Sequence, residues 1–197
     1  MYVRTSFRLD AFVGRDESGA MKSLRSTLFI LSALVLTTSP LLAQEKKPRV
    51  SPHETVNATV GGTKITIVYG RPYMKDPKTG EKRKIWGGLV PFGKVWRMGA
   101  DEATLLTTDK DITIGGTAIA AGTYSLYLWP EDGGAKLIVN KQTGQWGTKY
   151  DEKQDLVRID LKKSAAEKPA DQFTIAVDNG MLKLMWEDTQ YSAQIKS

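Results

Sequence analysis

Residues 60–69 read VGGTKITIVY, a glycine pair followed by a run in which apolar side chains recur at every second position. Alternation with a period of two is typical of a half-buried β-strand, here with Ile65, Ile67 and Tyr69 on the buried face. Paired glycines can adopt the positive φ values that a tight primed turn requires. This stretch therefore predicts a hairpin turn that leads into an antiparallel strand.

The same pattern continues along the rest of the chain. Ile114-Gly115-Gly116-Thr117 and Asp178-Asn179-Gly180 repeat the hairpin signal, and Gly, Asp or Pro separates the alternating segments. Roughly eight to ten short strands without an amphipathic helix predict an all-β fold, a single antiparallel β-sandwich or jelly roll. A closed β-barrel is the alternative, which periodicity does not distinguish. Further strands are expected over 103–108, 123–129, 135–140, 156–161, 173–177, 182–186 and 191–195, with a surface connection over 165–170.

One long segment, from Arg71 to Glu102, fits neither a strand nor a helix. It is rich in apolar side chains, which disordered segments normally lack, and loops of this length in a compact domain are usually functional or disordered. We therefore expect an ordered loop folded over one end of the sandwich. In that loop Arg71, Arg97 and Glu102 are expected to form one polar cluster walled by Trp86 and Trp96.

The N-terminus has the features of an export signal. A short basic start runs from Met21 to Arg25, and residues 28–36 form an apolar run of signal-peptide rather than membrane-spanning length. We expect residues 1–43 to be a leader and signal peptide, cleaved after Ala43. Residues 1–20 are then a mis-called start or an extended leader. The alternative is a membrane anchor that stays in place.

Composition indicates one exported domain. About 150 residues remain after the leader, enough for one core, and we expect a flexible lead-in over 44–53 and a β-sandwich domain over 54–197. The chain has no cysteine, so its core must suffice without disulfides. Without residues 1–43 the net charge falls from +6 to +4, which is too mild to indicate nucleic-acid binding. We expect a periplasmic or extracellular protein without a stable membrane span after signal cleavage.

Few side chains are suited to catalysis. The chain has no thiol nucleophile, and its single histidine, His53, lies in the predicted lead-in, where a triad base would not be held rigid. One imidazole does not supply a histidine-rich metal site, so we expect neither a metal nor a cofactor. Oxygen ligands for calcium at Asp151, Glu152 and Asp155 are an alternative. Their spacing matches no EF-hand loop, and a solvated turn is preferred.

Asp101 and Glu102 are the remaining acid–base candidates. Neighbours on a strand point to opposite faces, so these two carboxylates would not flank one glycosidic bond. We prefer an interpretation in which Glu102 forms a structural ion pair with Arg97 or Arg71. The alternative is that the same arginine–carboxylate cluster lines a cleft.

The tryptophans have two possible roles. Packing is the default, but indole rings also form platforms for sugar rings or cations, and Trp146 follows a predicted strand, where sandwiches carry binding loops. The candidate ligand-binding residues are Arg71, Trp86, Trp96, Arg97, Asp101, Glu102 and Trp146.

Several runs carry a resemblance to a known family. They are Tyr69-Gly70-Arg71-Pro72, the segment from Ile85 to Arg97 (IWGGLVPFGKVWR), Gly99-Ala100-Asp101-Glu102-Ala103-Thr104, Ala121-Gly122-Thr123-Tyr124-Ser125-Leu126, Asn140-Lys141 and Gln145-Trp146-Gly147. Over residues 50–195 the chain resembles the bacterial exported family known as domain of unknown function 2911. The resemblance implies an exported, β-rich domain and brings no activity or catalytic residues. The family commonly has Asn at position 101, and residues 75–82 are longer here than in the usual link.

Three classes of function are compatible with the sequence. A non-catalytic ligand-binding or scaffolding module of the cell envelope ranks first, because a specific long loop accompanies a poor catalytic inventory, and an enzyme is the less favoured reading. A carboxylate-dependent enzyme acting on envelope glycans is second. A structural partner of a larger exported assembly is third. The expected partner is accordingly an envelope glycan or another protein.

The leader can be tested directly. Protein recovered from the envelope fraction is expected to begin at or near Gln44, because signal peptidase removes the segment that ends in Ala43. Intact-mass measurement should show the loss of residues 1–43. A full-length product in the cytoplasm would contradict export.

Overall fold

The computed structural model describes residues 49–197, and the predicted leader over 1–43 lies outside them. No helix in this part of the chain is long and apolar enough to cross a membrane. Its elements are β1 (His53–Val60), β2 (Thr63–Gly70), β3 (Thr104–Thr108), β4 (Ile112–Ile114), β5 (Thr117–Ile119), β6 (Gly122–Pro130), β7 (Ala135–Asn140), a short 3₁₀ turn (Glu152–Gln154), β8 (Asp155–Asp178) and β9 (Met181–Lys196).

All nine strands belong to one antiparallel sheet with the order β1-β2-β3-β6-β7-β8-β9-β4-β5. The two ends of this order, β1 and β5, do not pair with each other, so the sheet is not closed into a barrel. The all-β prediction is confirmed, and of its two forms the open sandwich is the one the structure adopts.

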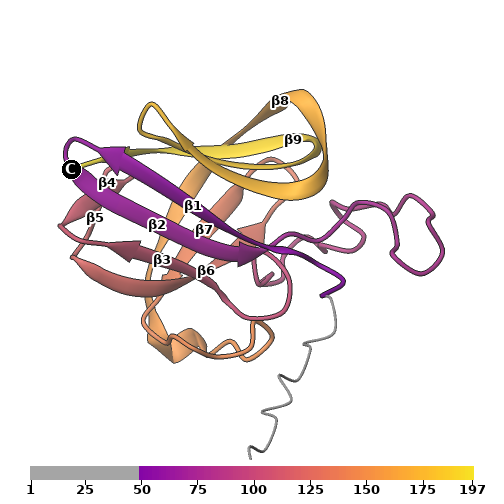
Figure 1. The fold of residues 1–197 in the computed structure, drawn as a ribbon, viewed down its shortest axis with the longest axis horizontal. Helices are drawn as coiled ribbons and strands as arrows, with labels where there is room; N and C mark the ends of the chain where they lie inside the picture. Colours follow the sequence, from indigo (N-terminus) through magenta and orange to yellow (C-terminus); the bar gives the residue numbers. More distant parts are fainter. Residues whose placement is uncertain (1–48) are drawn as a thin grey trace, which may run out of the picture. The chain divides into compact units, whose positions relative to one another are not determined.

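The sheet becomes two layers because β8 runs through both of them. Residues 155–161 of β8 pair with β7, whereas residues 162–178 pair with β9. Figure 1 shows the resulting β8–β9 hairpin lying across β1 and β2. The Tyr69 hydroxyl of β2 accepts a hydrogen bond of 2.9 Å from the backbone N–H of Ile175 in β8, which joins the layers directly.

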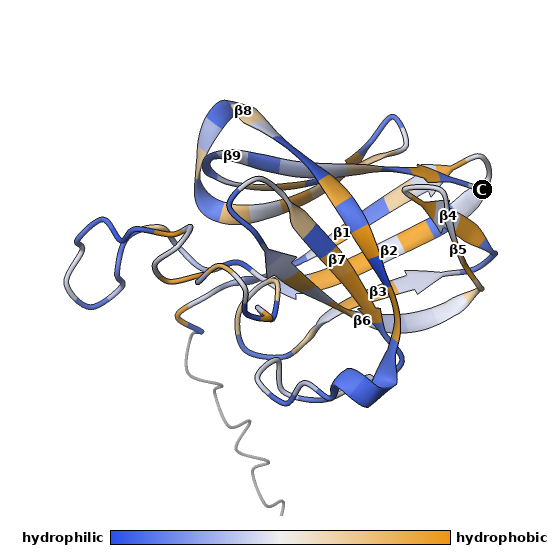
Figure 2. Cartoon of the chain, turned by 180° about the vertical axis from the view of Figure 1, so that it is seen from behind, coloured by the Kyte–Doolittle hydropathy of each residue, from blue (hydrophilic) through white to orange (hydrophobic). Residues whose placement is uncertain are grey.

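The core lies between these layers. Apolar side chains from alternate positions meet there, and Figure 2 shows apolar and polar residues alternating along the strands. A second, smaller cluster, of Ala103, Tyr127 and Ile138, covers the other face of the sheet. The largest fully buried side chains are Trp186, Tyr69, Tyr127, Tyr191, Phe173, Ile65, Ile67, Ile85, Met98, Leu106, Ile114 and Ile119.

Three hairpin turns confirm their sequence signals. Gly61-Gly62 joins β1 to β2, Gly115-Gly116 joins β4 to β5, and Asn179-Gly180 joins β8 to β9. Both residues of every pair have positive φ, between 49° and 82°. This is the backbone that a primed two-residue turn requires, and it explains the residue types found there.

The predicted surface connection over 165–170 is wrong, because this segment continues β8. It is paired with β9 at Ala165 and Ala170, and the register shifts between these positions absorb the additional residues. Most of its side chains are exposed, so no alternation of apolar residues marks it as a strand. Two pairs of predicted strands, 156–161 with 173–177 and 182–186 with 191–195, therefore form the single strands β8 and β9.

Two glycines of the β4–β5 turn allow the cost of backbone strain to be compared with the cost of a steric clash. Gly116→Ala is expected to cost about 1–2 kcal/mol, because position 116 is left-handed (φ 82°) but open space surrounds it. Gly115→Ala should cost more, since its Cβ would lie 2.8 Å from Cγ2 of Ile159. Urea denaturation measures both free energies of unfolding. Equal losses would contradict the close approach of the turn to β8.

Candidate functional site

The long loop between β2 and β3 is ordered, as predicted. Trp96 exchanges two backbone hydrogen bonds with Leu128 of β6, of 2.8 and 2.9 Å, and the Met74 N–H donates to the carbonyl of Asp171 in β8. Ile85 and Val90 are fully buried in the main core. The loop is thus attached to both layers of the sandwich. Exposed positions remain along its length, among them residues 77–82, Leu89 and Phe92, and the loop projects from the sandwich (Figure 1).

Tryptophans fasten this loop to β9. The ring of Trp96 stacks on that of Trp186 with centroids 5.6 Å apart and planes 24° apart. Trp86 packs edge-on against Trp96 at 6.2 Å, and its indole N–H donates to the Trp186 carbonyl at 3.3 Å. Trp186 is fully buried. Trp86 and Trp96 therefore pack the loop, which was the default interpretation of their role.

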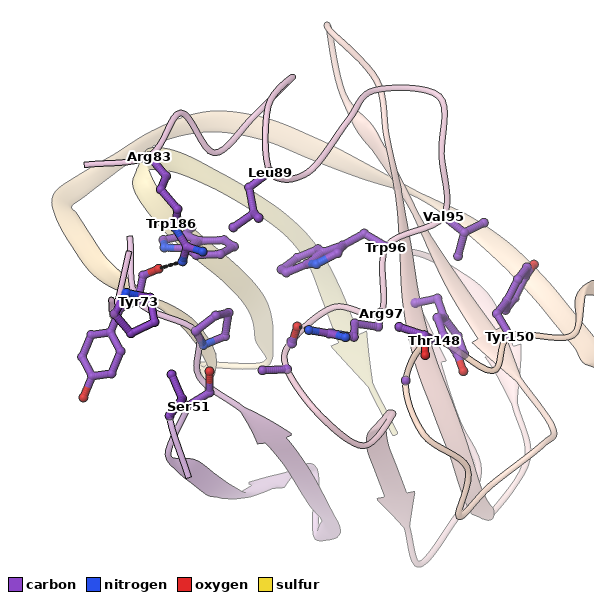
Figure 3. Close-up of a pocket in the computed structure, with 17 residues that line it drawn as sticks. Ser51, Tyr73, Arg83, Leu89, Val95, Trp96, Arg97, Thr148, Tyr150 and Trp186 are labelled. Atoms are coloured by element: carbon purple, nitrogen blue, oxygen red, sulfur yellow. Dashed lines mark hydrogen bonds between the residues drawn. The ribbon is translucent and has the colours of Figure 1, made fainter. Parts of the chain in front are cut away.

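A pocket of about 480 Å³ opens beside this aromatic cluster (Figure 3). Its walls come from the segment before β1, the long loop, the segment between β7 and β8, and single side chains of β6 and β9. The lining residues are Val50, Ser51, Pro72, Tyr73, Pro77, Arg83, Leu89, Val95, Trp96, Arg97, Gly99, Ala100, Tyr127, Gly147, Thr148, Tyr150 and Trp186.

Two tyrosines line the pocket and are held by hydrogen bonds. Tyr150 lies on the side opposite Trp186 in Figure 3. Tyr127 accepts from Nε2 of Gln145 at 3.0 Å, and Tyr150 donates to Asp155 at 2.6 Å. Burial raises the pKa of both phenols above its ordinary value of 10.0. The shift is away from the phenolate form, so the pKa gives no support for either ring as a base near pH 7.

A separate polar cluster surrounds Glu102. Arg49 binds its carboxylate with both terminal nitrogens, one at 2.8 Å, and His53 Nε2 lies 3.2 Å from the same carboxylate. Asp101 is 3.7 Å from both Arg49 and His53. The Arg49 hydrogen bond is the main reason why the pKa of Glu102 falls from its ordinary value of 4.5 to about 2.

Backbone pairing holds these carboxylates in place. The Gly147 N–H donates to the Asp101 carbonyl at 2.9 Å, and the Ala103 N–H donates to the Gln145 carbonyl at 3.1 Å. Glu102 and Trp146 thus face each other in a short bridge. This arrangement brings together three predicted site residues, Asp101, Glu102 and Trp146, although none of them lines the pocket.

The expected pairing of Glu102 with Arg71 or Arg97 is wrong. Arg71 forms an ion pair of 2.6 Å with Glu54 and donates to Thr174, while Arg97 lines the pocket. The partner of Glu102 is Arg49, which precedes it by 53 residues and was assigned to the lead-in. His53, likewise assigned there, is the first residue of β1. Sequence spacing does not show that these residues meet.

His53, Asp101 and Glu102 each offer a ligand atom within 4.8 Å of the others, a set that suits a divalent cation in its residue types. Neither the histidine-rich site nor the calcium alternative at Asp151, Glu152 and Asp155 predicted this mixed set. Arg49, however, already occupies both oxygens of Glu102. A cation would have to displace this guanidinium to bind there.

The second group of carboxylates is engaged in the structure of a turn. Asp151 caps the 3₁₀ turn by accepting from the Lys153 N–H at 3.0 Å, and Arg158 binds Glu152 and Asp155. Asp155 also accepts from Asn140. These contacts agree with the preferred interpretation of a turn, and they leave the carboxylates poorly placed to bind calcium together.

Sequence reasoning found two of the pocket's principal residues, Trp96 and Arg97, and missed others. Tyr127 falls within the predicted strand 123–129, and nothing in its position indicated a pocket. Thr148 and Tyr150 directly follow the Gln145-Trp146-Gly147 run, which could have served as a signal. Trp186 was recognised only as a member of a strand.

The fold and the pocket together define an all-β sandwich domain with an aromatic-walled concave site at one end. The sequence profile of the family described as "Protein of unknown function (DUF2911)" matches residues 51–195, and the chain belongs to this family. No curated protein and no solved structure matches the chain.

The Glu102 cluster leads to a prediction about pH. Arg49→Gln is expected to raise the pKa of Glu102 from about 2 toward 4.5, because it removes the main group that favours the carboxylate. Glu102 stabilises the wild-type fold above pH 4.5, and this contribution is lost as the pH falls toward 2. Arg49→Gln should therefore lose less free energy of unfolding than the wild type as the pH falls from 4.5 to 2. NMR titration of the carboxyl carbon measures the pKa.

Arg71→Gln is the matched control, because it removes an arginine bound to a different carboxylate, Glu54. It should leave the pKa of Glu102 unchanged. If the pKa of Glu102 changed in Arg71→Gln and not in Arg49→Gln, Arg49 would not be the partner of Glu102.

Proposed function

We propose that this chain is an exported, non-catalytic binding module that takes a small ligand into the pocket at the end of its sandwich. The pocket itself carries the proposal. Concave sites of several hundred Å³ with aromatic walls and a few polar groups are the usual form of small-molecule sites. Export rests on the N-terminal signal pattern, and it makes envelope glycans and other small envelope compounds the first ligands to consider.

The mouth of the pocket supports this choice. Val50, Tyr73 and Leu89 line it and are 65%, 42% and 45% exposed, which is high for large apolar side chains. Exposed apolar side chains gathered at one concave site lower solubility and add nothing to folding. Such a group is typical of a surface that a ligand or partner covers. A ligand that enters the pocket would remove part of this surface from water.

An unpartnered donor adds a second argument. The indole nitrogen of Trp186 is buried and has no hydrogen-bond partner among residues 49–197. Leaving a buried donor unpaired costs about 1–3 kcal/mol, and such groups call for an explanation such as a bound molecule. Trp186 borders the pocket, so this unpaired donor belongs to a residue beside the proposed ligand site. A ligand oxygen or a water would have to enter the buried side of the ring to satisfy it.

The geometry gives less support to an enzyme acting on glycans. The pocket lining contains no carboxylate, and a glycosidase needs two of them across one cleft. Ser51 lines the pocket two residues from His53, but no hydrogen bond between them occurs in the described chain. His53 Nε2 instead lies 2.8 Å from Arg49. A nucleophile–base pair is therefore not assembled there.

A steric block tests the proposal. Thr148 is exposed and lines the pocket, so Thr148→Trp should fill the pocket without disturbing the core. The purified chain is titrated with N-acetylglucosamine oligomers, other soluble envelope glycan fragments and small ring compounds, and the Trp96 indole N–H is followed by NMR. At least one compound should bind, and Thr148→Trp should weaken it by about tenfold or more.

Thr143→Trp is the control, because Thr143 is an exposed residue of the same segment outside the pocket lining. It should bind as the wild type does. Binding that survives the block, or no binding by any compound, would refute the proposal. Hydrolysed glycan in the same samples would favour the enzyme instead, and protein capture without small-molecule binding would favour a structural partner.

A further inference from the structure

We propose that Arg97 makes this pocket selective for a ligand with a carboxylate on a ring-shaped body. The inference rests on the proposed function, because it names the chemistry of the ligand for the same pocket. A sugar acid and an aromatic acid share this chemistry. Four observations support it. They are the fixed orientation of Arg97, the unpaired N–H groups of its guanidinium, the positive charge of the pocket lining, and the aromatic side chains of the pocket walls.

Arg97 is held in one orientation. Its Nε donates to the Gly99 carbonyl at 3.1 Å. Its stem packs so closely on Gly147 that a Cβ there would lie 2.8 Å from Cδ and 2.9 Å from Cβ of Arg97. Figure 3 shows the side chain amid the lining residues, with Trp186 on one side and Tyr150 on the other. An arginine fixed in this way loses little further entropy when it binds a ligand.

The outer part of the guanidinium is unused. Arginine has five N–H donors, of which Nε provides one. The four on the terminal nitrogens make no hydrogen bond or ion pair with any residue from 49 to 197. Two parallel N–H groups of this fork match the two oxygens of a carboxylate, which is the strongest common form of such contacts.

Arg83, the other arginine of the lining, is arranged differently. Its Nε donates to the Met74 carbonyl at 3.3 Å and a terminal nitrogen donates to the Tyr73 carbonyl. Its remaining terminal nitrogen lies 4.0 Å from Asp76. Arg83 therefore stabilises the loop, whereas the terminal nitrogens of Arg97 remain available to a ligand. Substitution of Arg83 can serve as a control for substitution of Arg97.

The charge of the lining favours an anion. Arg83 and Arg97 are its only charged residues. The carboxylates nearest to Arg97 in sequence, Asp101 and Glu102, contact Arg49 and His53 outside the pocket. No negative group among the lining residues opposes a bound carboxylate, and a cleft with one sign of charge concentrates ligands of the opposite sign.

The walls favour a ring. Tyr127 and Tyr150 lie together with ring centroids 4.8 Å apart, and Trp96 with Trp186 borders the pocket elsewhere. Aromatic side chains offer flat apolar surface that suits the faces of sugar and aromatic rings. The pocket thus combines surfaces for a ring with one free guanidinium for its acid group.

Two matched pairs of probes test the inference on the purified chain. Glucuronate is compared with glucose, and phenylacetate with 2-phenylethanol, so that each pair differs in the acid group. Dissociation constants come from the Trp96 indole signal. In at least one pair the acid should bind about 10- to 100-fold more tightly than the neutral compound, as expected for hydrogen bonds to a charged partner. The pair in which the acid binds more tightly shows whether the pocket prefers a sugar ring or an aromatic ring.

Arg97→Gln should abolish this ratio, because it should weaken binding of the acid far more than binding of the neutral compound. Arg83→Gln, the matched control, should keep most of the ratio. Arg97→Lys keeps the charge without the fork and should give an intermediate ratio, and it provides a second variant if the glutamine variant does not fold.

The outcomes separate this inference from the proposed function. If acids and neutral compounds bind equally well, the inference is overturned and the pocket remains a binding site. If both Arg97 variants still bind the acid more tightly than the neutral compound by the wild-type ratio, another group binds the carboxylate. The inference is then overturned. If no probe binds, the inference is overturned, and the wider compound panel decides the proposed function.

Discussion

The stacking of Trp96 on Trp186 is the contact on which the architecture of this site depends. Trp186 is fully buried in β9, whereas Trp96 belongs to a loop that is paired with β6 in the other layer. The two rings therefore connect the loop to both layers. A segment of this length would lose much conformational entropy on ordering, and burial of large aromatic surfaces offsets that loss. Both rings also line the pocket.

Charged groups are divided between two places with different functions. Outside the pocket, Arg49 neutralises Glu102 and ties the segment before β1 to the residues that precede β3. Inside the pocket, Arg97 has no such partner in the described chain. Because Glu102 takes its guanidinium from Arg49, Arg97 remains free for another acceptor.

Much of the fold was predictable because it follows local rules. Strands with one buried face alternate in hydropathy, and paired positive φ values select Gly or Asn, as at Gly61-Gly62 and Asn179-Gly180. The segment 165–170 escaped these rules because it pairs through its backbone while its side chains stay mostly exposed. The continuity of β8 through both layers was hidden for the same reason.

The site was predictable only in part. The sequence alone determined that the segment 71–102 is an apolar, tryptophan-rich loop attached to a β-sandwich, because composition and periodicity are local properties. Which charges pair, and which side chains share a pocket, was decided by tertiary structure. Arg49 meets Glu102 across 53 residues of chain, and Trp96 meets Trp186 across a still longer separation. Such pairings depend on strand order and on a strand shared between two layers, which no local pattern encodes.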